Sequence, residues 1–122
     1  MATLTPTLTL TSSDVSSDTL SLSVTDSLTV EAPIINVSTI TATTTGNASI
    51  ILPSVNAARY VYLKHTGLNS AGSSSGADKV EVETADGTAI MELKSGEFAF
   101  FPYFAQGAGL LQLEASANTV QV

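Results

Sequence analysis

The chain has 122 residues, a length typical of one domain with a single modest core. It contains no cysteine, which excludes disulfides and thiolate metal sites. Eleven acidic against four basic residues give a net charge of −7, so a surface that neutralises the phosphates of nucleic acid or of anionic lipid is not expected.

Hydropathy along the chain argues against helices and membrane spans. No run of about 18 apolar residues occurs, and no basic N-terminal stretch precedes a shorter apolar run, so we expect neither a membrane span nor a signal peptide. Apolar residues at helical spacing are not sustained for more than about one turn. Alternation with a period of two recurs instead, and it predicts an all-β chain.

Residues 1–30 are predicted to form a Thr/Ser-rich N-terminal arm or hairpin. In TLTLTSSD (7–14) and TLSLSVTD (19–26), leucines alternate with hydroxyl residues, and the Ser/Asp-rich interval between them has the composition of a turn. One face of these strands is therefore leucine, including Leu8 and Leu10. Because the other face is so polar, the register is weakly specified, and we expect an extended arm able to lie on a neighbouring molecule.

Residues 31–122 are predicted to form a β-sandwich. Short β-branched or aromatic segments predict its first strands, at 34–40, 47–52 and 59–65. Tyr60 and Tyr62 share one face of the third strand, and two interpretations are open for them, cover from the same chain or a subunit interface. The Gly/Ser-rich segment 67–77 is interpreted as a mobile surface loop, with a specific binding loop as the alternative.

Asp86-Gly87 predicts a hairpin with a two-residue type I′ turn, which needs positive φ at both central positions. Its register gives one apolar face, made by Val80 with Leu93, Val82 with Met91 and Thr84 with Ala89. The opposite side places Glu81 across from Glu92, between lysines. We interpret this charged side as a solvated sheet face.

Five of the seven aromatic residues lie in KSGEFAFFPYF (94–104). Ser95-Gly96 predicts a second tight turn, whose register places Phe98 and Phe100 in the core. The same register predicts outward positions for Ile90, Phe101 and Tyr103. An outward Phe needs a cover, and two interpretations are open, another part of the same chain or another subunit.

The last stretch, from Gly109 to Val122, alternates again and predicts two strands. Their inward residues are expected to be Leu111, Leu113, Val120 and Val122. About ten short strands separated by turn signals are typical of a β-sandwich or jelly roll.

No pattern in the chain predicts catalysis, a cofactor or a metal site. His65 is the only histidine, which excludes a multi-histidine metal site. Asp14, Asp18 and Asp26 lack the ligand spacing of a calcium loop and are interpreted as loop caps. A hydrolase is kept as an alternative, and it would need His65 in a cleft beside a carboxylate and a nucleophile.

The order of RYVYLKHTG (59–67), KVEVETADGTAIMELKSGEFAFFPYF (79–104) and GLLQLEA (109–115), with the N-terminal ATLTPTLTLTSSD (2–14), resembles small virion proteins encoded by tailed bacteriophages of cyanobacteria and marine bacteria. The similarity covers most of the chain and lies in strand and turn patterns. It implies a noncatalytic decoration or cement protein, a dimer or trimer on the outside of the phage head. Its other partner would be the major capsid protein, bound across neighbouring capsomers.

The resemblance implies a location in the virion, after assembly in the host cytoplasm, without nucleic acid or membrane as a partner. Two other functions stay open, a neck or tail accessory protein, and a host-adhesion β-sandwich that stacks carbohydrate on Tyr60, Tyr62 and Tyr103. The candidate interface residues are Phe101, Tyr103, Ile90, Tyr60, Tyr62, Leu8 and Leu10.

Overall fold

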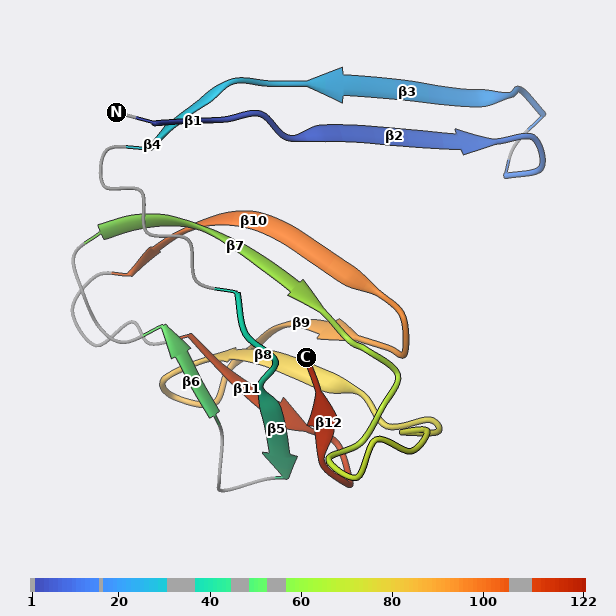
Figure 1. Ribbon diagram of the computed structural model, residues 1–122. Helices are drawn as coiled ribbons and strands as arrows, with labels where there is room; N and C mark the ends of the chain where they lie inside the picture. Colours follow the sequence, from blue (N-terminus) through green and yellow to red (C-terminus); the bar gives the residue numbers. More distant parts are fainter. Residues whose placement is uncertain (1, 16, 31–36, 45–48, 53–56, 106–110) are drawn as a thin grey trace. The chain divides into compact units, whose positions relative to one another are not determined.

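The computed structural model describes residues 2–15, 17–30, 37–44, 49–52, 57–105 and 111–122. These residues form twelve strands (Figure 1). The strands belong to two compact units, Met1–Val37 and Ser38–Val122, which are called the N-terminal unit and the body below.

The N-terminal unit consists of two antiparallel strand pairs. Its strands are β1 (Ala2–Leu4), β2 (Thr7–Ser12), β3 (Leu20–Thr25) and β4 (Leu28–Val30). β1 pairs with β4, and β2 pairs with β3. Across the second pair, Leu8 faces Val24 and Leu10 faces Leu22, whereas every pair on the other side joins threonine or serine residues. The alternation predicted for these two strands is therefore confirmed.

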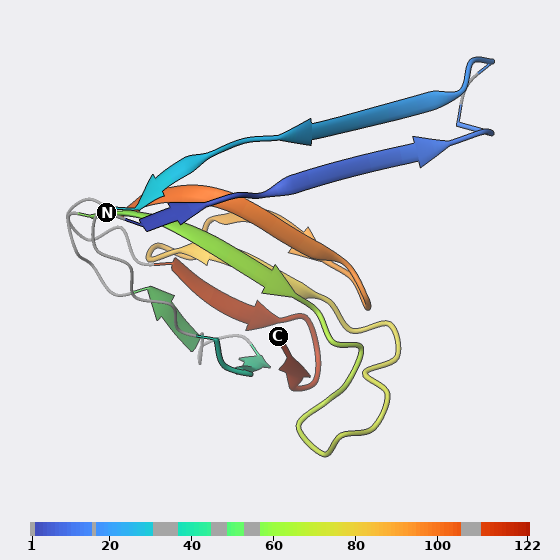
Figure 2. The same cartoon turned by 45° about the horizontal axis from the view of Figure 1, so that its top comes forward.

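The body is built from two sheets. Its strands are β5 (Thr41–Thr44), β6 (Ser49–Leu52), β7 (Ala57–Lys64), β8 (Val80–Thr84), β9 (Ala89–Leu93), β10 (Phe98–Ala105), β11 (Leu111–Ala115) and β12 (Val120–Gln121). Six strands form one sheet in the order β12-β5-β11-β8-β9, with β6 also paired to β11. β7 and β10 form a second, antiparallel sheet that lies over the first (Figures 1 and 2).

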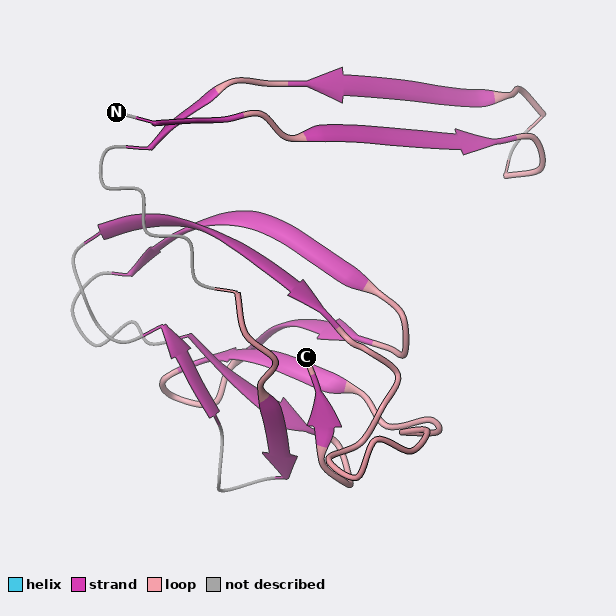
Figure 3. Cartoon of the chain, viewed as in Figure 1, coloured by secondary structure: helices cyan, strands magenta, loops and turns pink. Residues whose placement is uncertain are grey.

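All regular structure in the described residues is strand, so the predicted all-β class is confirmed (Figure 3). The two layers of the body are sandwich-like, and the jelly-roll order of connections stays a prediction. The strand predicted at 34–40 is wrong in its described part, because residues 37–40 belong to no strand and β5 begins at Thr41. Residues 34–36 lie outside the described residues.

The core lies between the two sheets of the body. β7 contributes Val61 and Leu63, and the larger sheet contributes completely buried side chains, which are Ala42, Val80, Val82, Leu111, Leu113, Ala115 and Val120. Burying one Val or Leu side chain fully stabilises the fold by about 1.5–3 kcal/mol. The inward positions predicted for Leu111, Leu113 and Val120 are confirmed, and Val122 is partly buried against the same core.

The β8–β9 hairpin closes with a three-residue loop, so the predicted two-residue turn is wrong. The N–H of Gly87 donates to the carbonyl of Thr84, and the N–H of Thr84 donates to the carbonyl of Thr88, both at 3.0 Å. Gly87 has a φ of 79°, and no described non-glycine residue has a positive φ. This is the geometry of a type I turn followed by a left-handed glycine.

Ile90 is an extra residue in β9 that restores the register of the hairpin. Val82 pairs with Met91 but Glu83 pairs with Ala89, so the ladder skips Ile90 as at a β-bulge. The bulge compensates for the longer loop, so the core-side pairs predicted for Val82 and for the neighbouring Val80 are confirmed. The predicted pair of Thr84 with Ala89 is wrong, because Ala89 pairs with Glu83.

Segment 67–77 is hydrogen-bonded along much of its length, which the interpretation as a mobile loop did not anticipate. Leu68 and Ser74 form an isolated bridge, and the Asn69 carboxamide oxygen accepts from two backbone N–H groups at 3.0 Å each. The N–H of Gln121 donates to the carbonyl of Leu68 at 2.9 Å, which attaches the segment to β12.

Candidate interaction surface

The register between β7 and β10 decides which side chains share a face. Phe100 lies opposite Tyr62, Pro102 opposite Tyr60, and Phe98 opposite Lys64. Residues opposite one another in an antiparallel pair point to the same side. The side away from the core therefore gathers five rings, called the aromatic face below, from Tyr60, Tyr62, Phe98, Phe100 and Phe104.

The aromatic face is open to solvent. Its exposed fractions are 39% for Tyr60, 43% for Phe100, 58% for Phe104 and 60% for both Tyr62 and Phe98. Because an aromatic side chain can bury about 150–250 Å², the five rings leave roughly 500 Å² exposed. A patch of that size is near the largest found on an ordinary monomer, about 300–600 Å², and often marks an interaction site.

The rings of the aromatic face contact one another along diagonals of the sheet. The centroids of Tyr60 and Phe100 lie 6.0 Å apart with their planes 10° from parallel. Those of Tyr62 and Phe98 lie 6.3 Å apart at 36°. Diagonal pairs of this kind are within reach of aromatic side chains in an antiparallel sheet, and they join four of the five rings in two pairs.

Phe101 and Tyr103 point the other way, toward the core. Both are partly buried and pack against the core cluster, and their rings meet edge to face at 6.5 Å and 89°. The predicted orientation of β10 is therefore wrong. Phe98 and Phe100 are the outward residues, and Phe101 and Tyr103 are the covered ones.

The reason is that the turn at Ser95-Gly96 changes sheets. β9 belongs to the six-stranded sheet, whereas β10 pairs with β7 in the other layer. The turn is closed by the N–H of Glu97 donating to the carbonyl of Lys94 at 2.9 Å, and the N–H of Gly96 donates to the carbonyl of His65 at 3.0 Å. Because β9 and β10 do not pair with one another, the register of β9 does not determine which residues of β10 point inward. The inward side of β10 is the side that packs against the six-stranded sheet.

The other predicted interface residues do not form one surface. Tyr60 and Tyr62 lie together on the aromatic face, whereas Ile90, 46% exposed, lies in the opposite sheet. Leu8 and Leu10 are 46% and 44% exposed in the N-terminal unit. The sequence-based prediction missed Phe98, Phe100 and Phe104, although their spacing of two and four residues is a strand-face signal.

His65 has a structural role. Its side chain is completely buried, and its Nδ1 accepts the N–H of Gly67 at 3.0 Å. The proton must then be on Nε2, which donates to the carbonyl of Asp78 at 3.0 Å. Both ring nitrogens are thus used by the backbone, and the ring is not placed to act as a base on a bound substrate.

Glu83 is an almost buried carboxyl group on the outer side of the larger sheet, with 4% of the residue exposed. Desolvation raises its pKa above the ordinary 4.5, although Gln112 Nε2, which donates to Glu83 Oε2 at 3.3 Å, opposes the shift. The negative charges of Glu114 and Glu81 add to the rise. The charged form of the Glu83 carboxyl group is therefore disfavoured at this position.

The predicted pair of Glu81 and Glu92 is confirmed as a cross-strand pair. Lys79 Nζ lies 3.1 Å from Glu92 Oε1, an exposed salt bridge of a kind that contributes about 0–1 kcal/mol. Within the part of the chain that the structure describes, no three His, Asp or Glu side chains are grouped so that they could hold a metal ion.

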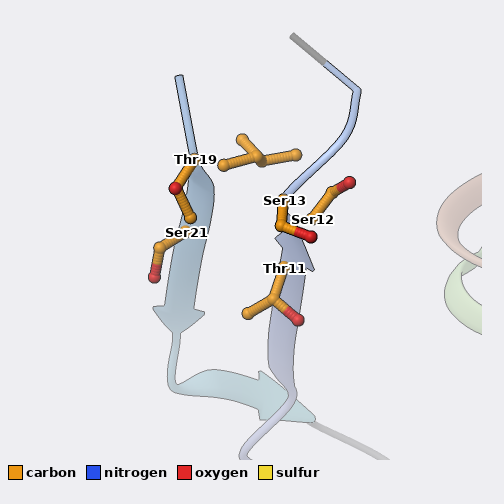
Figure 4. A pocket seen from close by; sticks show the side chains of 6 residues that line it. Thr11, Ser12, Ser13, Thr19 and Ser21 are labelled. Carbon is orange, nitrogen blue, oxygen red and sulfur yellow. The ribbon is translucent and has the colours of Figure 1, made fainter. Parts of the chain in front are cut away.

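A shallow hollow lies at the turn end of the β2–β3 hairpin (Figure 4). It is lined by Thr11, Ser12, Ser13, Thr19, Leu20 and Ser21. The lining consists of hydroxyl groups and one leucine, so it offers no acid or base for catalysis.

Comparisons of the chain with protein-family models, curated proteins and solved structures find no match. Among the described residues, no helix of the length and apolarity needed to cross a membrane is present.

Proposed function

We propose that this chain is a noncatalytic structural protein of a tailed-phage virion, a decoration or cement protein on the outer surface of the head. It associates with itself as a dimer or trimer and binds across neighbouring capsomers of the major capsid protein. The observation that carries the proposal is the aromatic face, roughly 500 Å² of exposed rings on a body whose buried histidine serves the backbone.

The physical requirements of a cement protein support this proposal. Such a protein works by adding contact area across a seam, which favours a rigid scaffold with exposed apolar surfaces. The body supplies a packed two-layer scaffold, and the N-terminal unit supplies a ribbon with exposed Leu8 and Leu10. The resemblance of the strand and turn patterns to virion proteins points to the same role.

Cryo-electron microscopy of purified particles from a phage that encodes this chain tests the proposal. We expect density for the β-sandwich body on the outside of the head, at the borders between capsomers. Density at the neck or tail would replace the proposal with the accessory role. Absence of the chain from particles would overturn both.

Tyr60 and Tyr62 on one exposed face favour carbohydrate adhesion as a second candidate function. The inward position of Tyr103 removes one of the three rings expected to stack on sugar. Retention of the full chain on a glycan column, lost in Tyr62→Ala but not in Ile90→Ala, would favour adhesion over cementing.

A further inference from the structure

The β2–β3 hairpin carries a second uncovered apolar surface, called the leucine face below. It consists of Leu8, Leu10, Leu20, Leu22 and Val24, which are 41–50% exposed. The reverse side of the same two strands is threonine and serine. A two-stranded hairpin is at best marginally stable in water by itself, so this one needs a partner for its apolar side.

We infer that the leucine face packs on the aromatic face of a second copy of this chain, so that copies associate by exchanging their hairpins. The inference deepens the proposed function, because it rests on the self-association proposed there and names the two surfaces that make it. The occupant of the aromatic face is the Thr7–Thr25 hairpin of a neighbouring copy.

The two surfaces match in shape. Each is one side of a two-stranded antiparallel sheet, with strands of six residues in the hairpin and eight residues in β7 and β10. At about 3.4 Å per residue these strands are roughly 20 and 27 Å long. The hairpin therefore fits within the length and width of the aromatic face, and the contact would repeat ordinary packing of one sheet on another.

The charged residues beside the two surfaces have opposite signs. Lys64 is the only charged side chain that alternation places on the aromatic face. The Thr7–Thr25 hairpin carries Asp14 and Asp18 in its turn, Asp26 follows it directly, and no Lys or Arg occurs before Arg59. Two aromatic faces stacked on one another would leave both leucine faces without a partner.

The areas are sufficient for a stable complex. With roughly 500 Å² of exposed rings, one contact buries about 1,000 Å² when the matching loss on the hairpin is included. A reciprocal exchange makes two such contacts, about 2,000 Å² in total, which reaches the range of stable protein–protein interfaces.

Sedimentation velocity of the full chain, without particles, tests the inference with neighbouring residues of β2 that face opposite sides. We expect Leu10→Glu to raise the dissociation constant of self-association at least about tenfold, and Thr9→Glu to change it less than about twofold. Circular dichroism and urea unfolding check that both variants keep the folded body. Equal effects of the two substitutions, or a wild-type chain that stays monomeric at all concentrations, would overturn the inference.

Cross-linking identifies the chain that supplies the hairpin. Because the protein has no cysteine, a chain with Leu22→Cys and a chain with Phe100→Cys each carry one thiol. A thiol cross-linker of about 10 Å, the spacing of packed sheets, should join the two different chains when they are mixed. The matched control uses Ser23→Cys, on the hydroxyl side of β3, and should give little product.

Two cross-linking results would overturn the exchange. One is equal product with Ser23→Cys. The other is a link formed only within a doubly substituted chain, with none between mixed chains. Particle imaging is independent of these outcomes, since a monomer found on heads would refute hairpin exchange while leaving the cement function intact.

Discussion

Phe100 and Phe101 are neighbours in β10 with opposite environments. Phe100 is 43% exposed on the aromatic face, whereas Phe101 packs against the core cluster. Two adjacent residues of one type thus lie on opposite sides of the sheet, because a strand sends successive side chains to opposite sides.

Serine substitutions should show this difference directly. Phe101→Ser removes core packing and should lower the free energy of unfolding by about 2–4 kcal/mol, somewhat less than full truncation of a completely buried Phe. Phe100→Ser should stay within about 0.5 kcal/mol of wild type and weaken self-association instead. Urea unfolding followed by circular dichroism measures the first effect. The orientation of β10 described here would be wrong if the two substitutions exchanged their effects.

Glu83 should make stability fall as pH rises through a defined window. Its pKa is raised on folding, so the folded state binds the proton more tightly than the unfolded state between the ordinary value of 4.5 and the higher folded value. The stabilisation is complete below pH 4.5 and is lost as pH rises through the folded pKa. Glu83→Gln removes this slope and should raise the free energy of unfolding at neutral pH, since its amide oxygen still accepts from Gln112.

Chemical denaturation at several pH values between 4 and 8 checks that expectation. Glu92→Gln, an exposed change on the neighbouring strand, should keep the slope because Glu83 is still present. A slope that survives in Glu83→Gln would show that other carboxyl groups cause it.

At the scale of the element, strand positions and most pair registers were predictable. Alternation put Tyr60 on the side of its strand opposite Val61, and the Asp86-Gly87 hairpin gave the right partners for Val80 and Val82 but not for Thr84. β10 was not predictable, because it has aromatic residues on both sides and therefore no polar face. Alternation then defines two sides but does not say which one is buried.

The aromatic face also depends on a pairing that local sequence does not contain. Phe98 pairs with Lys64 and Ala105 with Ala57, across the whole of β8 and β9. A Ser-Gly turn serves equally well to reverse a strand within one sheet or to cross between two. Which of these two connections forms is decided by the packing of segments that are distant in the sequence.

The connection after β7 provides a prediction at this scale. Gly67 has a φ of 82°, and a Cβ placed there would lie 2.8 Å from Ser95 Oγ, whereas a Cβ at Gly72, with a φ of 76°, meets nothing within 4 Å. Both Gly→Ala changes should cost about 1–2 kcal/mol for the left-handed backbone. Gly67→Ala should cost more, because the Ser95 hydroxyl must also move.

A double-variant cycle separates these two contributions. Adding Ser95→Ala should recover the excess cost in Gly67→Ala and leave Gly72→Ala unchanged, as measured by urea unfolding. Equal losses of unfolding free energy in Gly67→Ala and Gly72→Ala would show that the contact with Ser95 Oγ has no effect on stability.

At the scale of the whole molecule, the N-terminal unit and the body differ in composition and in burial. The core cluster draws all its residues from positions 42–122, and the four basic residues of the chain are also in the body. The N-terminal unit contributes acidic charge and an apolar ribbon, which are properties of an interaction element.

Removing residues 1–37 should therefore leave the body folded. We expect residues 38–122 to keep their strand content and a cooperative unfolding transition, and to lose self-association. Circular dichroism with thermal unfolding, together with sedimentation, measures both properties. A truncated chain that fails to fold would show that the N-terminal unit is needed for the body core.

The turn from Lys94 to Glu97 connects the two sheets, and the number of residues in it decides which side chains of β10 face outward. One residue inserted before Phe98 would shift the register of β10 by one residue and move every side chain to the other side of the strand. Phe101 and Tyr103 would then face solvent, and Phe98 and Phe100 would face the interior. The composition of the strand would be untouched, yet a relative with that insertion would offer a different pattern of rings. The surface presented to a partner would thus change through spacing alone, without any aromatic residue being gained or lost.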